Sequence, residues 1–215
     1  MELEFVIEDL PKILASMKTG ADRIRQIVLS LRNFSRLDES EKKYVHLHEG
    51  LDNTCLILNN RFRALGIQVI KEYEQLPLLD CYPAQLNQVF MNILVNAIDA
   101  LESQKKSLPN SDVARIWIKT QVVHLPSPQI QVRIEDNGPG ISPEIKDKLF
   151  DPFFTTKEIG KGTGLGLAIA YQVIAKHGGT IEVTSQEGKG AIFLITLPVA
   201  VEVPEEIESP EFMVS

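Results

Sequence analysis

Residues 160–169 read GKGTGLGLAI, and an apolar run follows them. Four glycines here are unusual before an expected helix, because glycine costs about 0.5–1 kcal/mol relative to alanine inside a helix or strand. Glycine does leave backbone N–H groups uncovered, and a helix N-terminus carries a partial positive charge, so the two together bind phosphates. The segment therefore predicts a phosphate-binding loop formed by Gly162, Thr163, Gly164, Leu165, Gly166 and Leu167.

Two common phosphate-binding motifs do not fit this loop. The strand–GxxxxGK[ST]–helix motif needs a lysine after its last glycine, and the dinucleotide-binding motif needs a strand directly before its glycines. The connection from Gly140 to Gly164 is instead long for a compact domain, and such connections are usually lids or disordered. Lys157 and Lys161 lie on this connection. They are either solvated charges or ligands of the phosphates.

The composition excludes several classes of protein. The chain has 215 residues, of which 44% are hydrophobic and 24% charged, as in ordinary globular proteins. A net charge of −7 disfavours nucleic-acid binding. No apolar run reaches the length of a membrane span, and the acidic start MELEFVIEDL does not resemble a signal peptide. Two cysteines, Cys55 and Cys81, imply no disulfide framework, and we expect a cytoplasmic protein without membrane contact.

Residues 1–36 are expected to hold one long helix of a bundle. Two adjacent apolar seams run along it, one from Ile13 to Phe34 and one from Leu10 to Leu31. Such a wide apolar face is typical of a four-helix bundle and cannot be buried by a lone helix. The helix therefore either folds onto the rest of the chain or pairs with other helices. A charged linker, 37–44, separates it from a globular domain, 45–198, and an acidic, proline-containing tail, 199–215, is expected to be disordered.

The globular domain alternates strand and helix patterns. We expect strands at 45–47, 67–73, 78–81, 115–123, 129–136, 180–186 and 191–197, and helices at 50–65, 83–103 and 165–177. Glycines at 66 and 178–179 are helix stop signals. The predicted fold is α+β, a two-layer α/β sandwich in which one mixed sheet is covered by helices on one face, with the long helix in front of it.

Asn92, Asn96 and Asp99 lie within the strongly apolar pattern of the helix at 83–103. Asn92 and Asn96 are four residues apart and therefore share a helix face. Asparagine is unfavourable inside helices, because its side chain competes for backbone hydrogen bonds. Either the two amides hydrogen-bond a neighbouring loop, or Asn96 offers an oxygen to a Mg²⁺ ion held mainly by phosphates and water.

The segment EDNGPGI, residues 135–141, directly follows an expected strand. It is either a common turn or a base-binding loop. An ionised Asp136 only accepts hydrogen bonds, so it would select adenine, whose amino group donates, over guanine, whose carbonyl oxygen repels it. Gly138 and Gly140 would let the backbone approach a base closely.

In this order, the motifs resemble those of the histidine kinase ATP-binding domain, in the family shared with gyrases, mismatch-repair ATPases and ninety-kilodalton heat-shock chaperones. QLNQVFMNILVNAIDAL resembles the asparagine box, and DNGPGI the first glycine box. LFDPFFTTK resembles the phenylalanine box, GKGTGLGLAIA the second glycine box, and HGGTIEVTSQEGKGAIFLITLP the last strands. The resemblance covers roughly 45–198 and implies the Bergerat-type ATP fold of the GHKL family.

The resemblance implies a role for each matching position. Asn96 would ligate Mg²⁺ with Asn92 beside it, and Asp136 would contact the adenine of ATP. Lys157 and the loop at 162–166 would meet the triphosphate, while Phe150, Phe153 and Phe154 would anchor a lid. The predicted nucleotide site is completed by Asp99, Gly138, Gly140, Ile141, Thr156, Lys161 and Leu167.

Asn92 also separates the functions found in this family. The hydrolytic relatives carry, one helical turn before the Mg²⁺-binding asparagine, a glutamate that activates water. Here that position is Asn92, and an amide is no general base, which favours a histidine kinase over an ATPase clamp. Two further alternatives stay open, a nucleotide-binding interaction module without kinase activity and a serine kinase of the anti-sigma type.

Residues 13–36 resemble the second helix of the kinase dimerisation bundle, which implies a homodimer when intact. The family's phosphate-accepting histidine lies on the first helix, followed by an acidic residue and a proline. None of His46, His48, His124 and His177 has this context. We therefore expect a kinase fragment that lacks its acceptor and cannot phosphorylate itself alone. Its expected partners are an acceptor-histidine helix and the receiver domain of a response regulator.

Overall fold

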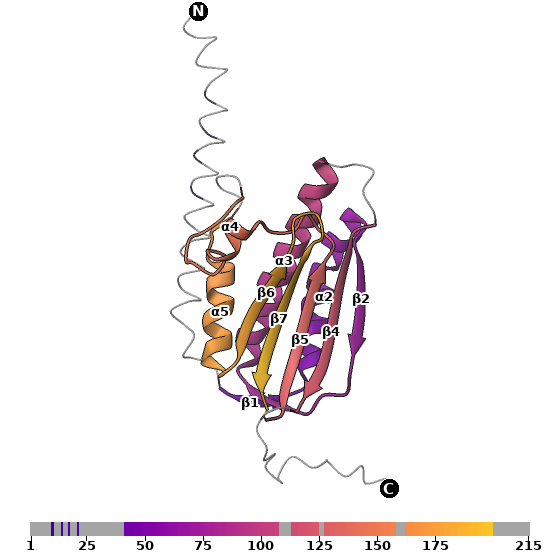
Figure 1. Ribbon diagram of the computed structural model, residues 1–215, viewed down its shortest axis with the longest axis vertical. Helices are drawn as coiled ribbons and strands as arrows, with labels where there is room; N and C mark the ends of the chain where they lie inside the picture. The colour runs from indigo at the N-terminus through magenta and orange to yellow at the C-terminus, as the bar shows by residue number, and fades with distance from the viewer. Residues whose placement is uncertain are drawn as a thin grey trace, which may run out of the picture.

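The computed structural model describes residues 41–107, 113–124, 127–157 and 162–199, together with four helical positions, Leu10, Leu14, Met17 and Ala21 (Figure 1). The remainder of the expected helix within 1–36, residues 37–40 of the linker, Lys161 and the tail beyond residue 199 lie outside the described residues.

The described elements follow one another as β1 (Lys43–Val45), α2 (Leu47–Leu65), β2 (Gln68–Tyr73), β3 (Leu79–Cys81), α3 (Pro83–Ser107), β4 (Arg115–Val123), β5 (Gln129–Asp136), α4 (Pro143–Lys146), α5 (Gly166–Lys176), β6 (Thr180–Ser185) and β7 (Ala191–Pro198). A five-stranded sheet has the order β2-β4-β5-β7-β6, in which β2 is parallel to β4 and the other pairs are antiparallel. Helices α2, α3 and α5 lie behind one face of this sheet (Figure 1). The predicted two-layer sandwich with a mixed sheet is confirmed.

Three details of the predicted fold are wrong. The prediction of a single sheet fails, because β1 pairs only with β3 in a separate two-stranded antiparallel sheet. The first strand ends at Val45, and α2 already begins at Leu47, because Leu47 and Leu51 are one turn apart and both buried in the core. The short helix α4 was not predicted within the long connection after Gly140.

The core between the sheet and the helices explains why α3 is the central element. Its apolar residues are almost completely buried and include Leu86, Val89, Phe90, Ile93, Leu94 and Ile98. They pack with the inward residues of the sheet, among them Ile116, Ile118, Ile130, Val132 and Ile195. Burying one such side chain contributes about 1.5–3 kcal/mol, so α3 is firmly fixed beneath the polar residues that it carries.

His177 connects α5 to the start of α3. Its Nε2 accepts a hydrogen bond from the Tyr82 backbone N–H at 3.0 Å, so its Nδ1–H donates to the Val173 carbonyl oxygen at 2.7 Å. Both bonds require the neutral ring, and burial lowers the pKa of His177 in agreement with this. The neutral ring of His177, the C-cap of α5, thus joins the end of this helix to the residue before α3.

Candidate functional site

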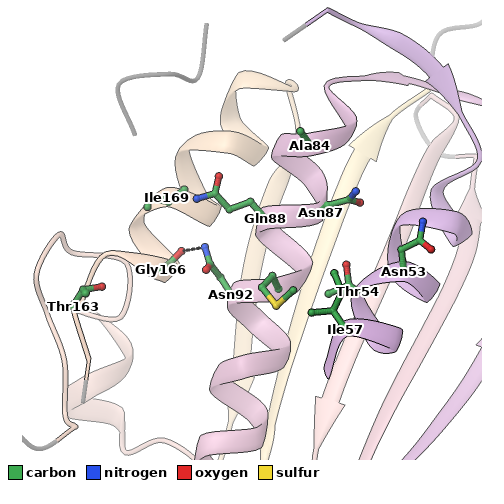
Figure 2. A pocket seen from close by; sticks show the side chains of 11 residues that line it. Asn53, Thr54, Ile57, Ala84, Asn87, Gln88, Asn92, Thr163, Gly166 and Ile169 are labelled. Atoms are coloured by element: carbon green, nitrogen blue, oxygen red, sulfur yellow. Dashed lines mark hydrogen bonds between the residues drawn. The ribbon is translucent and has the colours of Figure 1, made fainter. Parts of the chain in front are cut away.

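Asn92 joins α3 to the first residue of α5. Its Nδ2 donates a hydrogen bond to the Gly166 carbonyl oxygen at 2.8 Å, and a Cβ atom at Gly166 would touch the Asn92 side chain at 3.4 Å (Figure 2). Of the two interpretations of the helix asparagines, hydrogen bonding to a neighbouring loop therefore applies to Asn92. The bond fixes the start of α5, where the predicted phosphate-binding loop ends.

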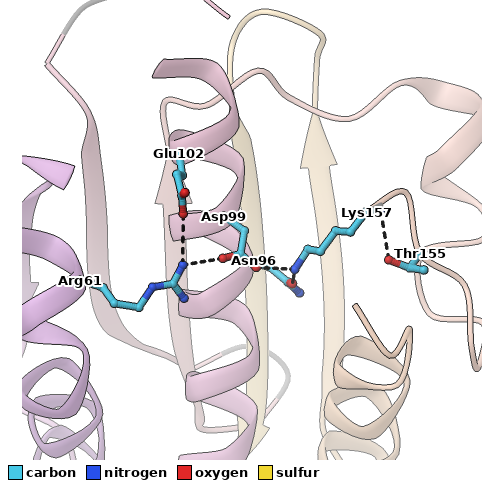
Figure 3. Close-up of polar contacts among 6 residues, drawn as sticks. All are labelled: Arg61, Asn96, Asp99, Glu102, Thr155 and Lys157. Atoms are coloured by element: carbon cyan, nitrogen blue, oxygen red, sulfur yellow. Dashed lines mark hydrogen bonds and ion pairs between the residues drawn. The ribbon is translucent and has the colours of Figure 1, made fainter. Parts of the chain in front are cut away.

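Asn96 and Asp99 both contact the ammonium group of Lys157. The Lys157 Nζ atom donates to Asn96 Oδ1 at 2.9 Å and to Asp99 Oδ2 at 2.5 Å (Figure 3). The other carboxylate oxygen of Asp99 accepts a hydrogen bond from Arg61 at 2.6 Å, and Arg61 also pairs with Glu102 at 3.6 Å. Two oxygens on one face of α3 thus hold the lysine ammonium group.

Asp136, the last residue of β5, carries a buried carboxylate. It is 4% exposed, and its Oδ1 accepts the Gly138 N–H at 2.8 Å, with the Ala191 N–H as a further donor. Burial raises the pKa of Asp136 to about 6, and these two hydrogen bonds only partly oppose this effect. A Cβ atom at Gly138 would lie 3.4 Å from Ala100 Cβ, so the loop after β5 packs directly on α3.

The pKa of Asp136 predicts how stability depends on pH. The pKa of Asp136 is about 6 in the folded protein and 3.8 ordinarily, so folding favours the protonated carboxyl. Its contribution to stability is therefore fully present below pH 3.8 and is lost as the pH rises through 6. Denaturant unfolding measures the free energy of unfolding of the wild type and of Asp136→Asn. From acidic to neutral pH, the free energy of unfolding of the variant should rise by up to about 3 kcal/mol relative to that of the wild type. A difference that does not change with pH would contradict the raised pKa.

The turn between β6 and β7 supports the loop after β5. Gly140 and Gly190 both have positive φ, 74° and 82°, and a Cβ atom would overlap a backbone oxygen in each case, that of Gln186 and that of Asp136. Ser185 Oγ accepts the Ile141 N–H at 2.8 Å and donates to the Gly190 carbonyl oxygen at 2.6 Å. Ser185 and Gly190 belong to the predicted last strands and their connection, and the glycine pattern EGKG is the available sequence signal for this turn.

The long connection between β5 and α5 is held at Gly164. This residue has φ 66°, and a Cβ atom would overlap the Phe153 carbonyl carbon and lie 2.7 Å from Phe153 Cα. Phe153 itself has φ 67° and is 61% exposed. The expectation that its ring anchors the connection is therefore wrong, because its backbone makes the contact.

The other apolar residues predicted on this connection do pack inward. Phe150 packs against the core and against Tyr171, with ring centroids 5.5 Å apart. Leu165 is 4% exposed, so only its backbone can face a ligand, and Ile141 and Leu167 are partly buried against the core. Phe154 is half-buried and Thr156 exposed. Gly162 lies against Thr155 and Lys157, which brings the phosphate-binding loop next to the cation contacts.

A groove of about 570 Å³ opens between α2, α3 and α5 (Figure 2). Three residues of the predicted site line the groove, namely Asn92, Thr163 and Gly166, whereas Asp136 does not. Its remaining lining consists of Asn53, Thr54, Ile57, Ala84, Asn87, Gln88, Met91 and Ile169. Among the described residues, no ionisable side chain lines this groove.

His48 is bound into the fold on both sides. Its Nε2 lies 2.9 Å from Thr120 Oγ1, and its ring stacks on Tyr73 at a centroid distance of 4.2 Å. Among the described residues, no three or more His, Cys, Asp or Glu side chains gather to hold a metal ion. The described helices include none long and apolar enough to cross a membrane.

Comparison with known proteins identifies the domain. Residues 81–201 match the family described as histidine kinase-, DNA gyrase B-, and HSP90-like ATPase. The signal transduction histidine-protein kinase AtoS of Escherichia coli (strain K12) is 34% identical over 83% of this chain, which spans 27% of that relative's length.

Solved structures agree in fold. The catalytic domain of histidine kinase ThkA is 28% identical and superposes with a TM-score of 0.61, covering 74% of this chain and 96% of that domain. A second structure, ThkA in complex with response regulator protein TrrA, covers 90% of this chain and 52% of the kinase chain, at 24% identity and a TM-score of 0.67. The resemblance drawn from the motifs is confirmed, and the chain belongs to the histidine kinase-, DNA gyrase B-, and HSP90-like ATPase family.

Proposed function

We propose that this chain is the ATP-binding catalytic part of a sensor histidine kinase, which transfers the γ-phosphoryl group of ATP to a histidine outside the described residues. The globular domain would comprise residues 45–198. Asp136 would accept a hydrogen bond from the adenine amino group. The backbone N–H groups of 162–166, at the start of α5, would bind the triphosphate. Lys157 lies next to this loop and would reach the phosphates after a change of side-chain rotamer.

The lining of the groove carries this proposal. Water and serine hydroxyls need a general base to become nucleophiles, and no described residue of the groove could act as one. A neutral imidazole needs no such base, because its attacking ring nitrogen carries no proton that must first be removed. That nitrogen would form the N–P bond as the bond from the γ-phosphorus to the β–γ bridging oxygen breaks and ADP leaves. The groove adjoins Gly166 and gives an incoming histidine access to the phosphate end of the site.

Mg²⁺ fits the residues present. Asn96 Oδ1 already accepts a hydrogen bond from a cation, and Asp99 lies one turn further along the same face of α3. Asn96 would be the protein ligand of the metal, with phosphates and water completing its coordination. When bound, Mg²⁺ supplies charge neutralisation to the phosphates. The chain's own residues position the nucleotide, and the connection between β5 and α5 would shield it from water.

The same reasoning extends to partners. Leu10, Leu14 and Met17 are 51, 56 and 66% exposed and follow helical spacing, so they offer an apolar stripe to a further helix. A homodimer through this helix would follow. A response-regulator receiver domain would take the phosphoryl group from the acceptor histidine, as the ThkA complex with TrrA suggests for a protein of the same fold.

Phosphotransfer tests the proposal. The chain is incubated with Mg²⁺ and γ-labelled ATP, alone and with a separately made acceptor helix from a related kinase. We expect label only on the added helix, in an acid-labile and base-stable form typical of phosphohistidine. Asn96→Ala should abolish the transfer. Rapid release of free phosphate without any acceptor would favour an ATPase, acid-stable label a serine kinase, and ATP binding without transfer an interaction module.

A further inference from the structure

The ammonium group of Lys157 occupies the position that Asn96 would offer to a metal ion (Figure 3). We propose that Lys157 and a divalent cation are alternative occupants of the position beside Asn96 Oδ1 and Asp99 Oδ2, where Asn96 would ligate the metal and Asp99 would attract it as the neighbouring anion. The lysine must then leave these oxygens before the metal can bind. The inference rests on the proposed function only for the role of the metal, which would neutralise the phosphates of a bound nucleotide.

The contacts of Lys157 define a cation position. Its Nζ atom is bound by two oxygens of α3 at 2.9 and 2.5 Å, one neutral and one anionic. The side chains of Lys157 and Asp99 are 32% and 27% exposed, so ions from solvent can reach the position. An ammonium group and a divalent cation cannot share it, because like charges repel strongly at such distances.

Arg61 orients the Asp99 carboxylate for either occupant, the lysine or the metal. It donates to Asp99 Oδ1 at 2.6 Å, which leaves Oδ2 directed at Lys157. Arg61 pairs with both Asp99 and Glu102, and Lys157 pairs with Asp99. When Lys157 leaves, Asp99 Oδ2 loses this cation, which favours a divalent cation in its place. Arg61 and Asp99 are therefore positioning residues for both the lysine and the metal.

Lys157 can leave without moving the main chain. Its backbone N–H donates to Thr155 Oγ1 at 3.2 Å, a contact independent of the ammonium group. Exchange of the cation therefore needs only new side-chain rotamers, and it releases the positive charge for the nearby phosphate-binding loop. Binding of the metal is thereby coupled to the movement of the Lys157 ammonium group toward the phosphate-binding loop.

Binding of Mn²⁺ without nucleotide, followed by electron paramagnetic resonance, tests the exchange. Lys157→Met should bind Mn²⁺ about fivefold more tightly than the wild type, because a partly exposed ion pair contributes roughly 1 kcal/mol. The gain should disappear in Lys157→Met combined with Asp99→Asn. Lys148→Met, at an exposed lysine of the same connection, is the matched control and should leave Mn²⁺ affinity unchanged. Equal affinities for the wild type and Lys157→Met would overturn the proposal.

A second measurement uses the unmodified chain and avoids any folding defect. Acetylation of each lysine by an amine-reactive reagent is followed by mass spectrometry with and without Mg²⁺. Mg²⁺ should accelerate modification of Lys157 several-fold and leave Lys148 unaffected. An unchanged rate at saturating Mg²⁺ would contradict the exchange. Neither measurement contains ATP, so loss of the proposed kinase function would appear only in the phosphotransfer assay and would remain distinguishable.

Discussion

Gly164→Ala should reduce affinity for Mg·ATP at least tenfold while the domain stays folded. A left-handed residue with a side chain costs about 1–2 kcal/mol, and at Gly164 the new Cβ atom would in addition overlap the backbone of Phe153. The backbone must shift, and with it the N–H groups at 162–166 that would hold the triphosphate. Isothermal titration calorimetry measures the affinity, and thermal unfolding checks the fold.

The C-cap of α2 provides the matched control. Gly66 has φ 69° and no atom within 4 Å of an added Cβ, so Gly66→Ala has the same backbone cost without the overlap. It should lower stability by about 1 kcal/mol and leave ATP affinity within twofold of the wild type. Equal affinities for Gly164→Ala and Gly66→Ala would mean that these N–H groups do not bind the phosphates.

Asp136→Asn should lower ATP affinity about 100-fold and reduce the preference for ATP over GTP. Hydrogen bonds to a charged group contribute about 1.5–3 kcal/mol, and the amide would turn a donor toward the adenine amino group or the Gly138 N–H. The same replacement removes a buried charge, so the variant should bind ATP poorly although its stability relative to the wild type is higher at neutral than at acidic pH. Competition of ATP and GTP against a fluorescent nucleotide measures both affinities.

Glu135→Gln is the control for this change. It removes the neighbouring carboxylate, which pairs with Arg133 at 2.6 Å and is 32% exposed. ATP affinity should not change. A GTP affinity that is already equal to ATP affinity in the wild type would exclude Asp136 as the group that selects the base.

The pattern of the sequence predicts best where periodicity and turn signals agree. The strands at 115–123 and 129–136 have their predicted bounds, and Gly66 ends α2 in the left-handed conformation. The spacing of Asn92, Asn96 and Asp99 placed them correctly on a polar part of a buried helix. These features depend on contacts within one element, which a local pattern records.

The remaining features depend on contacts between distant segments. Arg61 reaches Asp99 only because α2 packs on α3, and Gly190 supports Asp136 only because β7 pairs with β5. Leu47 joins α2 because the core covers it, although its local sequence reads as a strand. The exposed ring of Phe153 follows from a positive φ imposed by the packing of Gly164. None of these contacts leaves a periodic signal.

The pairing of β5 with β7 has a consequence for how this family can diversify. Asp136 lies opposite Ala191, so the sheet joins the two strands independently of the segment between β5 and α5. Lengthening a closed loop costs little, about 0.6 kcal/mol for each doubling. Insertions beside the exposed residues Asp147 and Lys148 should therefore be tolerated by the fold. Evolution can vary this segment while the architecture beneath it stays the same.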